Sequence, residues 1–365
     1  MRAKLLDLLK IYEEEISLFL WTAALLFIIR SSGIILNNYA ETAFLKRFGV
    51  EFLPMVNMLN AVATFFVTGL LTAFLSKTPG AKLLSYIFIF SGTIVTVIRL
   101  LIPFGIDLLY PLLFMLKSQF ELLQALLFWN MCNDLFNTRQ SKRLFPLLTA
   151  GGVIGLILGS FGTPYFAGLF SMDNLLYLYL VTTILGALMI QAMGRSYATL
   201  IFTEKTGASG KKRPPMMEEI KRVYPLVKDS ILVKIVLVLT FMPNVVIPIM
   251  NYQFNYAVNE QFASESAMIT FFGNFRGVLY IVSLFILLFV GRIYGRWGMP
   301  VALMFHPFNY MLAFMAFLLR FDVISAMYAR MSTNIIRTTI NGPANSIIIG
   351  LFPESYRDMI RPFLR

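Results

Sequence analysis

The feature that most limits the fold of this chain is a succession of apolar stretches of about 20 residues, the length that an α-helix needs to cross a bilayer. The chain is 58% hydrophobic and only 14% charged, and a soluble domain of 365 residues cannot bury so much apolar surface. A membrane β-barrel is excluded, because its strands are short segments in which apolar and polar residues alternate. We therefore predict an all-α polytopic membrane protein. The expected spans are 17–36, 51–75, 82–104, 108–133, 144–170, 174–194, 230–252, 266–291, 298–319 and 322–350.

Basic residues between the spans predict the orientation of the chain in the membrane. They concentrate in alternate connections, whereas the other connections carry only Lys46, Arg47 and Arg320. Since cytoplasmic loops are enriched in Lys and Arg, we expect both termini to be cytoplasmic and the protein to lie in a bacterial inner membrane. The formal charge of +12 follows this same distribution, so nucleic-acid binding is not predicted.

A long polar segment divides the chain into two halves. It begins with flexible linker chemistry, "KTGASGKKRPP", and continues with "MMEEIKRVYPLVKD", whose helical spacing predicts a helix on the membrane surface. We expect a six-helix transmembrane half at 1–194, a basic cytoplasmic linker at 195–229 and a C-terminal transmembrane half at 230–365. The first stretch, "MRAKLLDLLKIYEEEIS", is expected to form a short amphipathic helix on the inner face, without a cleaved signal.

One turn, "GRIYGRWG" at Gly291–Gly298, resembles a turn of the major facilitator superfamily. In that superfamily a glycine-and-arginine turn follows the second helix of each half, which is its position here. The resemblance implies a major-facilitator-like helical bundle of twelve spans that works by alternating access. About ten spans are visible, so we expect the second half to be incomplete at Arg365.

Charged residues inside the spans predict a functional site, because ionisable groups are costly in a bilayer. Lys117 and Glu121 are four residues apart, so they share a helix face and are expected to form a pair. Glu121 is the only acid that we place at this depth. We expect Glu121 to release Lys117 when an anionic substrate enters.

A stripe of polar residues runs along one face of the last predicted span. Arg330, Asn334, Arg337 and Asn341 stand at i, i+4, i+7 and i+11, which places them on one face of an α-helix. Arginine forks suit phosphate, so a basic cavity favours an anionic substrate. Hydrogen bonds between helices are the alternative explanation of this stripe. The expected substrate-binding residues are Arg30, Asn37, Lys117, Glu121, Asn130, Asn244, Asn274, Arg276, Arg330, Asn334, Arg337 and Asn341.

Three longer motifs resemble a known family. They are "FWNMCNDLFNTRQSKRLFPLLTAGGVIGLILGS" at Phe128–Ser160, "AMITFFGNFRGVLYIVSLFILLFVGRIYGRWG" at Ala267–Gly298 and "NIIRTTINGPANSIII" at Asn334–Ile349. All three are similar to segments of the nucleotide transporter family, the non-mitochondrial ATP/ADP translocases of plastids and intracellular bacteria. The resemblance implies a secondary transporter that exchanges nucleotides of the ATP/ADP type.

The charged positions of that family are only partly matched. Ile34–Asn38 has no charge where the family carries Lys-Asp, Gln140 replaces an acidic residue, and Met250 and Asn251 stand near the position of a glutamate. Only the basic residue of the last span persists, as Arg337. Export or flipping of an anionic lipid or metabolite is therefore a second reading. A non-transporting membrane sensor or anchor, part of a larger fused protein, is a third.

Catalysis, cofactors and bound metals are not expected. The chain has one histidine, His306, and one cysteine, Cys132, so neither a metal site nor a nucleophilic constellation can be assembled around them. The expected partners are the lipid bilayer, an anionic small molecule and a fused or associated cytoplasmic domain.

Overall fold

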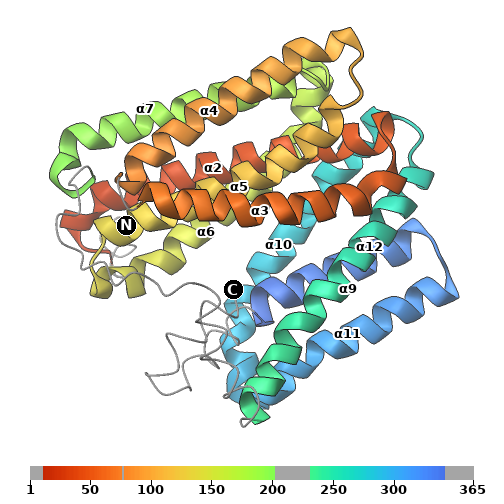
Figure 1. The fold of residues 1–365 in the computed structure, drawn as a ribbon. Coiled ribbons are helices and arrows are strands. Elements are labelled where there is room, and N and C mark those ends of the chain that lie inside the picture. Colours follow the sequence, from red (N-terminus) through yellow and green to blue (C-terminus); the bar gives the residue numbers. More distant parts are fainter. Residues whose placement is uncertain (1–10, 76–77, 202–230, 342–365) are drawn as a thin grey trace. The chain divides into compact units, whose positions relative to one another are not determined.

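The structure is a computed structural model that describes residues 11–75, 78–201 and 231–341. Over these ranges the chain is helical and contains no strand (Figure 1). Seven of the described helices are long and apolar enough to cross a membrane, and Leu303–Leu319 is a shorter apolar helix. The predicted fold class, an all-α polytopic membrane protein, is confirmed. The helices are α2 (Glu13–Arg47), α3 (Leu53–Leu75), α4 (Gly80–Leu101), α5 (Leu109–Leu135), α6 (Thr138–Phe170), α7 (Leu175–Ile201), α9 (Ile231–Gln261), α10 (Glu265–Trp297), α11 (Met299–Leu319) and α12 (Val323–Ile335), which continues as a π-helix (Ile336–Asn341).

Three sequence-based predictions fall wholly or partly outside the described residues. They are the amphipathic helix of residues 1–17, whose residues 13–17 belong to α2, the surface helix of the 195–229 linker and the final part of the 322–350 span.

The described residues form two compact units. The first contains the described parts of 1–206 together with 262–281, and the second contains the described parts of 207–261 and 282–365. Helix α10 therefore begins in the first unit and ends in the second. The predicted division at 195–229 stays a prediction, but it does not anticipate that the first part of α10 packs with the helices that precede the linker.

Helix α2 is longer than predicted. The sequence suggests an end near residue 36, because Asn37, Asn38 and Glu41 interrupt the apolar run, but the helix continues to Arg47. These polar side chains find partners on neighbouring helices instead of ending the helix. The first turn of α2 holds three glutamates and its last turn holds Lys46 and Arg47, an arrangement that complements the helix dipole.

Helices α2 and α6 approach closely through glycine. The spacing of the glycines between residues 151 and 162 predicts such packing. A Cβ atom added to Gly155 would lie 2.6 Å from the carbonyl oxygen of Phe27, and one added to Gly159 would lie 2.7 Å from that of Ser31. The expectation of close helix packing is therefore confirmed for these two glycines.

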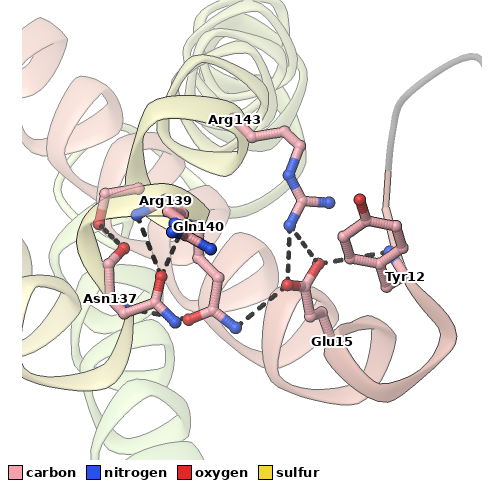
Figure 2. A network of polar contacts seen from close by, with 7 residues as sticks. Tyr12, Glu15, Asn137, Arg139, Gln140 and Arg143 are labelled. Carbon is pink, nitrogen blue, oxygen red and sulfur yellow. Dashed lines mark hydrogen bonds and ion pairs between the residues drawn. The ribbon is translucent and has the colours of Figure 1, made fainter.

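The basic turn between α5 and α6 is tied to the start of α2 (Figure 2). Asn137 caps α6 by accepting hydrogen bonds from the backbone N–H groups of Arg139 and Gln140, at 3.1 and 3.0 Å. The side chain of Gln140 and the guanidinium of Arg143 both donate to Glu15, at 3.1 and 2.8 Å. Gln140, at a position where the nucleotide transporters carry an acid, thus joins two helix starts within the first unit.

Helix α12 begins at a strong cap. Asp322 accepts a hydrogen bond from the backbone N–H of Ser325 at 2.9 Å, and this bond holds the pKa of Asp322 below its ordinary value. The charged carboxylate also complements the positive end of the helix dipole. The cap sets where the polar face of α12 begins.

Candidate functional site

The second unit contains a cavity of about 190 Å³ between α9 and α12. It holds three residues of the predicted stripe, Arg330, Asn334 and Arg337, because their spacing places them on one face of the helix. Helix α9 supplies the opposite wall. The described residues of the lining are Ile247, Met250, Asn251, Ala329, Arg330, Thr333, Asn334 and Arg337.

The charge of this cavity is positive. Among the described residues, its lining contains two guanidinium groups and no carboxylate. The guanidinium of Arg330 also lies 5.1 Å from the ring centroid of Phe254, a buried residue of α9, which supports its planar group on one side. Two guanidinium groups with neighbouring amides can bind a dianion such as a phosphate through charge-assisted hydrogen bonds.

Asn341 does not belong to this cavity. The predicted stripe assumed a regular α-helix, but residues Ile336–Asn341 form a π-helix, which has more residues in each turn. The side chain of Asn341 consequently turns to α11, where its Nδ2 contacts Nδ1 of the buried His306. The prediction of one continuous stripe is thus wrong at its last position.

A smaller pocket lies in the first unit. Its volume of about 20 Å³ is close to that needed by one water molecule. Arg30 and Glu121 face each other across it with 3.5 Å between Nη1 and Oε1. Glu121 therefore pairs with Arg30, not with Lys117 as predicted, because the helix spacing of residues 117 and 121 does not decide which neighbouring helix each of them meets. The lining is Ile29, Arg30, Gly33, Ile34, Asn37, Glu121, Gln124, Leu156 and Tyr280.

One buried acid of the first unit, Glu41, is not among the site residues predicted from the sequence. Its residue is only 4% exposed, and Arg276 donates to its carboxylate. Lys117 donates to Oδ1 of Asn37 at 2.6 Å, and its Nζ lies 3.9 Å from Oε2 of Glu41. Arg276 also donates to Asn38, whose amide donates to Thr163 at 2.9 Å.

A local signal could have revealed Glu41. It follows Asn37 by four residues and Asn38 by three, so all three share one face if the helix continues. The predicted helix end at residue 36 placed Glu41 in a connection instead. Glu121 is thus not the only acid that opposes the deep basic residues.

The other predicted site residues lie elsewhere. Asn130 is half-buried on α5, with its Oδ1 directly against Gly80 at the start of α4. Asn244 on α9 and Asn274 on α10 are exposed. None of these three lines either cavity.

No metal-binding cluster is found in the part of the chain that the structure describes. Across 11–75, 78–201 and 231–341, no three His, Cys, Asp or Glu side chains come together in a way that could hold an ion. Cys132 is buried in the apolar core of the first unit.

The arrangement of apolar helices is that of a known class of membrane transporter. A solved structure of a mutant of the nucleoside transporter NupG superposes with a TM-score of 0.67 at 16% identity, over 95% of this chain and 86% of that chain. A second NupG structure gives a TM-score of 0.65 at 14% identity, again over 95% and 86%. A POT family transporter in complex with a peptide conjugate gives 0.54 at 14% identity, over 94% and 86%. At these identities the likeness concerns the fold alone, which is an all-α fold with several membrane-spanning helices.

The sequence identifies the family within this class. Residues 120–350, more than half of the chain, match the family described as TLC ATP/ADP transporter. The chain belongs to this family, as its motifs predicted. A comparison with curated proteins gives no match.

Proposed function

We propose that this transporter carries an anionic, phosphorylated substrate, and that the substrate is a nucleotide exchanged in the ATP/ADP manner by alternating access. The observation that carries the proposal is the cavity between α9 and α12, whose described lining residues include two arginines and no acid. Membership of the TLC ATP/ADP transporter family supports the same substrate class.

In this proposal the substrate phosphates bind to α12. Arg330 and Arg337 supply paired N–H donors, and Asn334 with Asn251 of α9 supplies neutral hydrogen bonds. Arginine suits this role because its guanidinium stays charged and its fork matches two phosphate oxygens. Ile247 and Met250 give the cavity apolar surface for the uncharged part of the ligand.

The predicted ligands of the first unit take different parts. Arg30 and Asn37 line the small pocket beside Glu121 and remain candidates for a polar group of the substrate. Lys117 and Arg276 are assigned to the Glu41 network, because a buried carboxylate already opposes their charge. Asn130, Asn244 and Asn274 are not retained as ligands.

The cellular setting is part of the proposal. We place the protein in a bacterial inner membrane, and the distribution of Lys and Arg between the spans supports an orientation with both termini in the cytoplasm. A fused or associated cytoplasmic domain is compatible with this orientation.

The test is exchange of labelled ATP in proteoliposomes that contain the purified full-length protein. The vesicles are loaded with ADP, with inorganic phosphate or with buffer alone, and empty liposomes give the background. We expect uptake that requires internal ADP. Uptake driven equally well by phosphate would move the assignment to a broader phosphate carrier. No uptake by folded, correctly inserted protein would contradict nucleotide exchange and favour an anionic lipid or metabolite as the substrate.

A further inference from the structure

The first part of α10 docks closely onto the first unit. A Cβ atom added to Gly273 would lie 2.7 Å from the carbonyl oxygen of Ser160 on α6, and one added to Gly277 would lie 2.5 Å from the ring of Phe161. Residues 262–281 are flanked in the chain by 231–261 and 282–341, both of which belong to the second unit. The docked segment is therefore joined to the second unit at both of its ends.

Two ion pairs hold the segment against α2, and their polarity is opposite. Near the start of α10, Glu265 receives two hydrogen bonds from Arg47, at 2.6 and 2.7 Å, and Arg47 also pairs with Asp173 at 2.9 Å. Further along, α10 supplies the cation, Arg276, and α2 supplies the acid, Glu41. The inner pair is almost fully buried, with Arg276 6% and Glu41 4% exposed.

Separation of α10 from α2 would break the buried ion pair between Arg276 and Glu41. If Arg276 leaves, a buried carboxylate loses its main counter-ion, and an unpaired buried charge is strongly unfavourable. Lys117 is a second basic residue near this carboxylate, with its Nζ 3.9 Å from Oε2 of Glu41. Lys117 lies on α5, which packs with α2 inside the first unit.

We propose that Glu41 is a positioning residue for alternating access, which is handed from Arg276 to Lys117 when the first part of α10 leaves α2 and α6. Arg276 favours the docked arrangement and Lys117 favours the undocked one. Glu41 keeps a basic partner in both. The proposal goes beyond the proposed substrate, because it does not depend on which substrate is transported.

The test measures how often the surface beneath α10 opens. Ser160 is 0% exposed, its hydroxyl has no partner, and its backbone carbonyl lies under Gly273. A Ser160→Cys variant, made in a Cys132→Ala background, is labelled with a soluble maleimide in lipid nanodiscs. Ser91→Cys on α4, also at a position 0% exposed, is the matched control for general unfolding.

The two basic residues are expected to act in opposite directions. Arg276→Met should raise the labelling rate of the cysteine at position 160 by about tenfold or more, because docking loses its inner pair. Lys117→Met should lower that rate, because the undocked arrangement then lacks the lysine charge beside Glu41. Arg276→Lys and Lys117→Arg should each restore most of the original rate. Glu265→Gln, which weakens only the outer pair, should raise it.

A double variant separates the hand-off from simple loss of packing. When Glu41→Gln removes the charge that is shared, Lys117→Met should change labelling by less than about twofold. The proposal is overturned if Arg276→Met and Lys117→Met shift labelling in the same direction, or if Lys117→Met keeps its full effect beside Glu41→Gln. If Arg276→Met does not fold, as judged by gel filtration and by the control cysteine, the proposal is tested by the labelling rates of Glu41→Gln alone and of the double variant Glu41→Gln, Lys117→Met. Because labelling needs no substrate, failure here is distinct from failure of nucleotide exchange.

Discussion

At the scale of single residues, the deep arginines of this transporter differ in what surrounds them. Arg30 faces Glu121 at 3.5 Å, and Arg276 donates to Glu41. Arg330 and Arg337 line a cavity whose other lining residues include no acid. Guanidinium groups bind phosphate oxygens through charge-assisted hydrogen bonds, so we expect a phosphate to bind between Arg330 and Arg337.

Replacing either α12 arginine should therefore weaken substrate binding. We expect Arg330→Gln and Arg337→Gln each to lower the apparent affinity for ATP about tenfold or more, because each removes a charge-assisted hydrogen bond. The measurement is exchange of labelled ATP in proteoliposomes across a range of concentrations. Arg320→Gln, which alters a largely exposed arginine next to Asp322, is the control and should stay within about twofold. Equal loss in all three variants would contradict the assignment.

The basic turn before α6 offers a second contrast between residues. Arg143 is mostly buried and donates to Glu15, whereas Arg139 is exposed. Arg143→Ala leaves the buried carboxylate of Glu15 without its main donor and should lower the free energy of unfolding by about 1–3 kcal/mol. Arg139→Ala should change it by less than about 0.5 kcal/mol. Thermal unfolding of the purified protein checks both, and a similar loss in the two variants would contradict the role of Arg143.

At the scale of helices, close approach depends on which glycine faces a neighbour. Gly159 lies directly under the backbone of α2, whereas a Cβ atom at Gly168, on the same helix, would meet nothing within 4 Å. Spacing alone does not distinguish these positions, since both lie in α6. The distinction arises only when α6 is packed against α2.

Two alanine substitutions in α6 should therefore have opposite effects. Gly159→Ala should lower the unfolding temperature, because its Cβ would come within 2.7 Å of the Ser31 carbonyl oxygen. Gly168→Ala should raise stability by up to about 1 kcal/mol, because alanine is the better helix former. Thermal unfolding in the same detergent measures both. Destabilisation by Gly168→Ala would show that this face of α6 has a neighbour.

The π-helix at the end of α12 separates two asparagines that the sequence places on one face. Asn334 lines the cavity, whereas Asn341 contacts His306 on α11. We expect Asn334→Ala to raise the KM for ATP several-fold, and Asn341→Ala to lower thermal stability while the KM stays within about twofold. Transport kinetics and an unfolding scan on each variant provide the comparison. A raised KM in Asn341→Ala would restore the uninterrupted stripe.

At the scale of the whole molecule, ligand binding should report on folding stability. A ligand at about 100 times its Kd stabilises the state that binds it by about 2.7 kcal/mol. ATP should therefore raise the unfolding temperature of the purified protein, and the double variant Arg330→Gln, Arg337→Gln should lose this rise. Adenosine, which lacks the phosphates, serves as the control and should give a much smaller rise. An equal rise with adenosine would contradict phosphate recognition.

Much of this transporter could be predicted from its sequence alone. The length of the apolar stretches predicts the class of fold and most of the helices. Helical spacing predicts that Arg330 and Arg337 lie on one helix face. Both patterns can be read within a single stretch of chain. The motifs of Phe128–Ser160 and Ala267–Gly298 likewise indicate the family that residues 120–350 match.

Only the tertiary structure decided how the charges are shared. Lys117 meets Asn37 across 80 positions of sequence, and Arg276 meets Glu41 across 235. No local pattern selects such partners, because they depend on which helices pack together and in what register. For the same reason, the continuation of α2 to Arg47, the turn of Asn341 to α11 and the docking of residues 262–281 on the first unit emerged only when the helices were assembled.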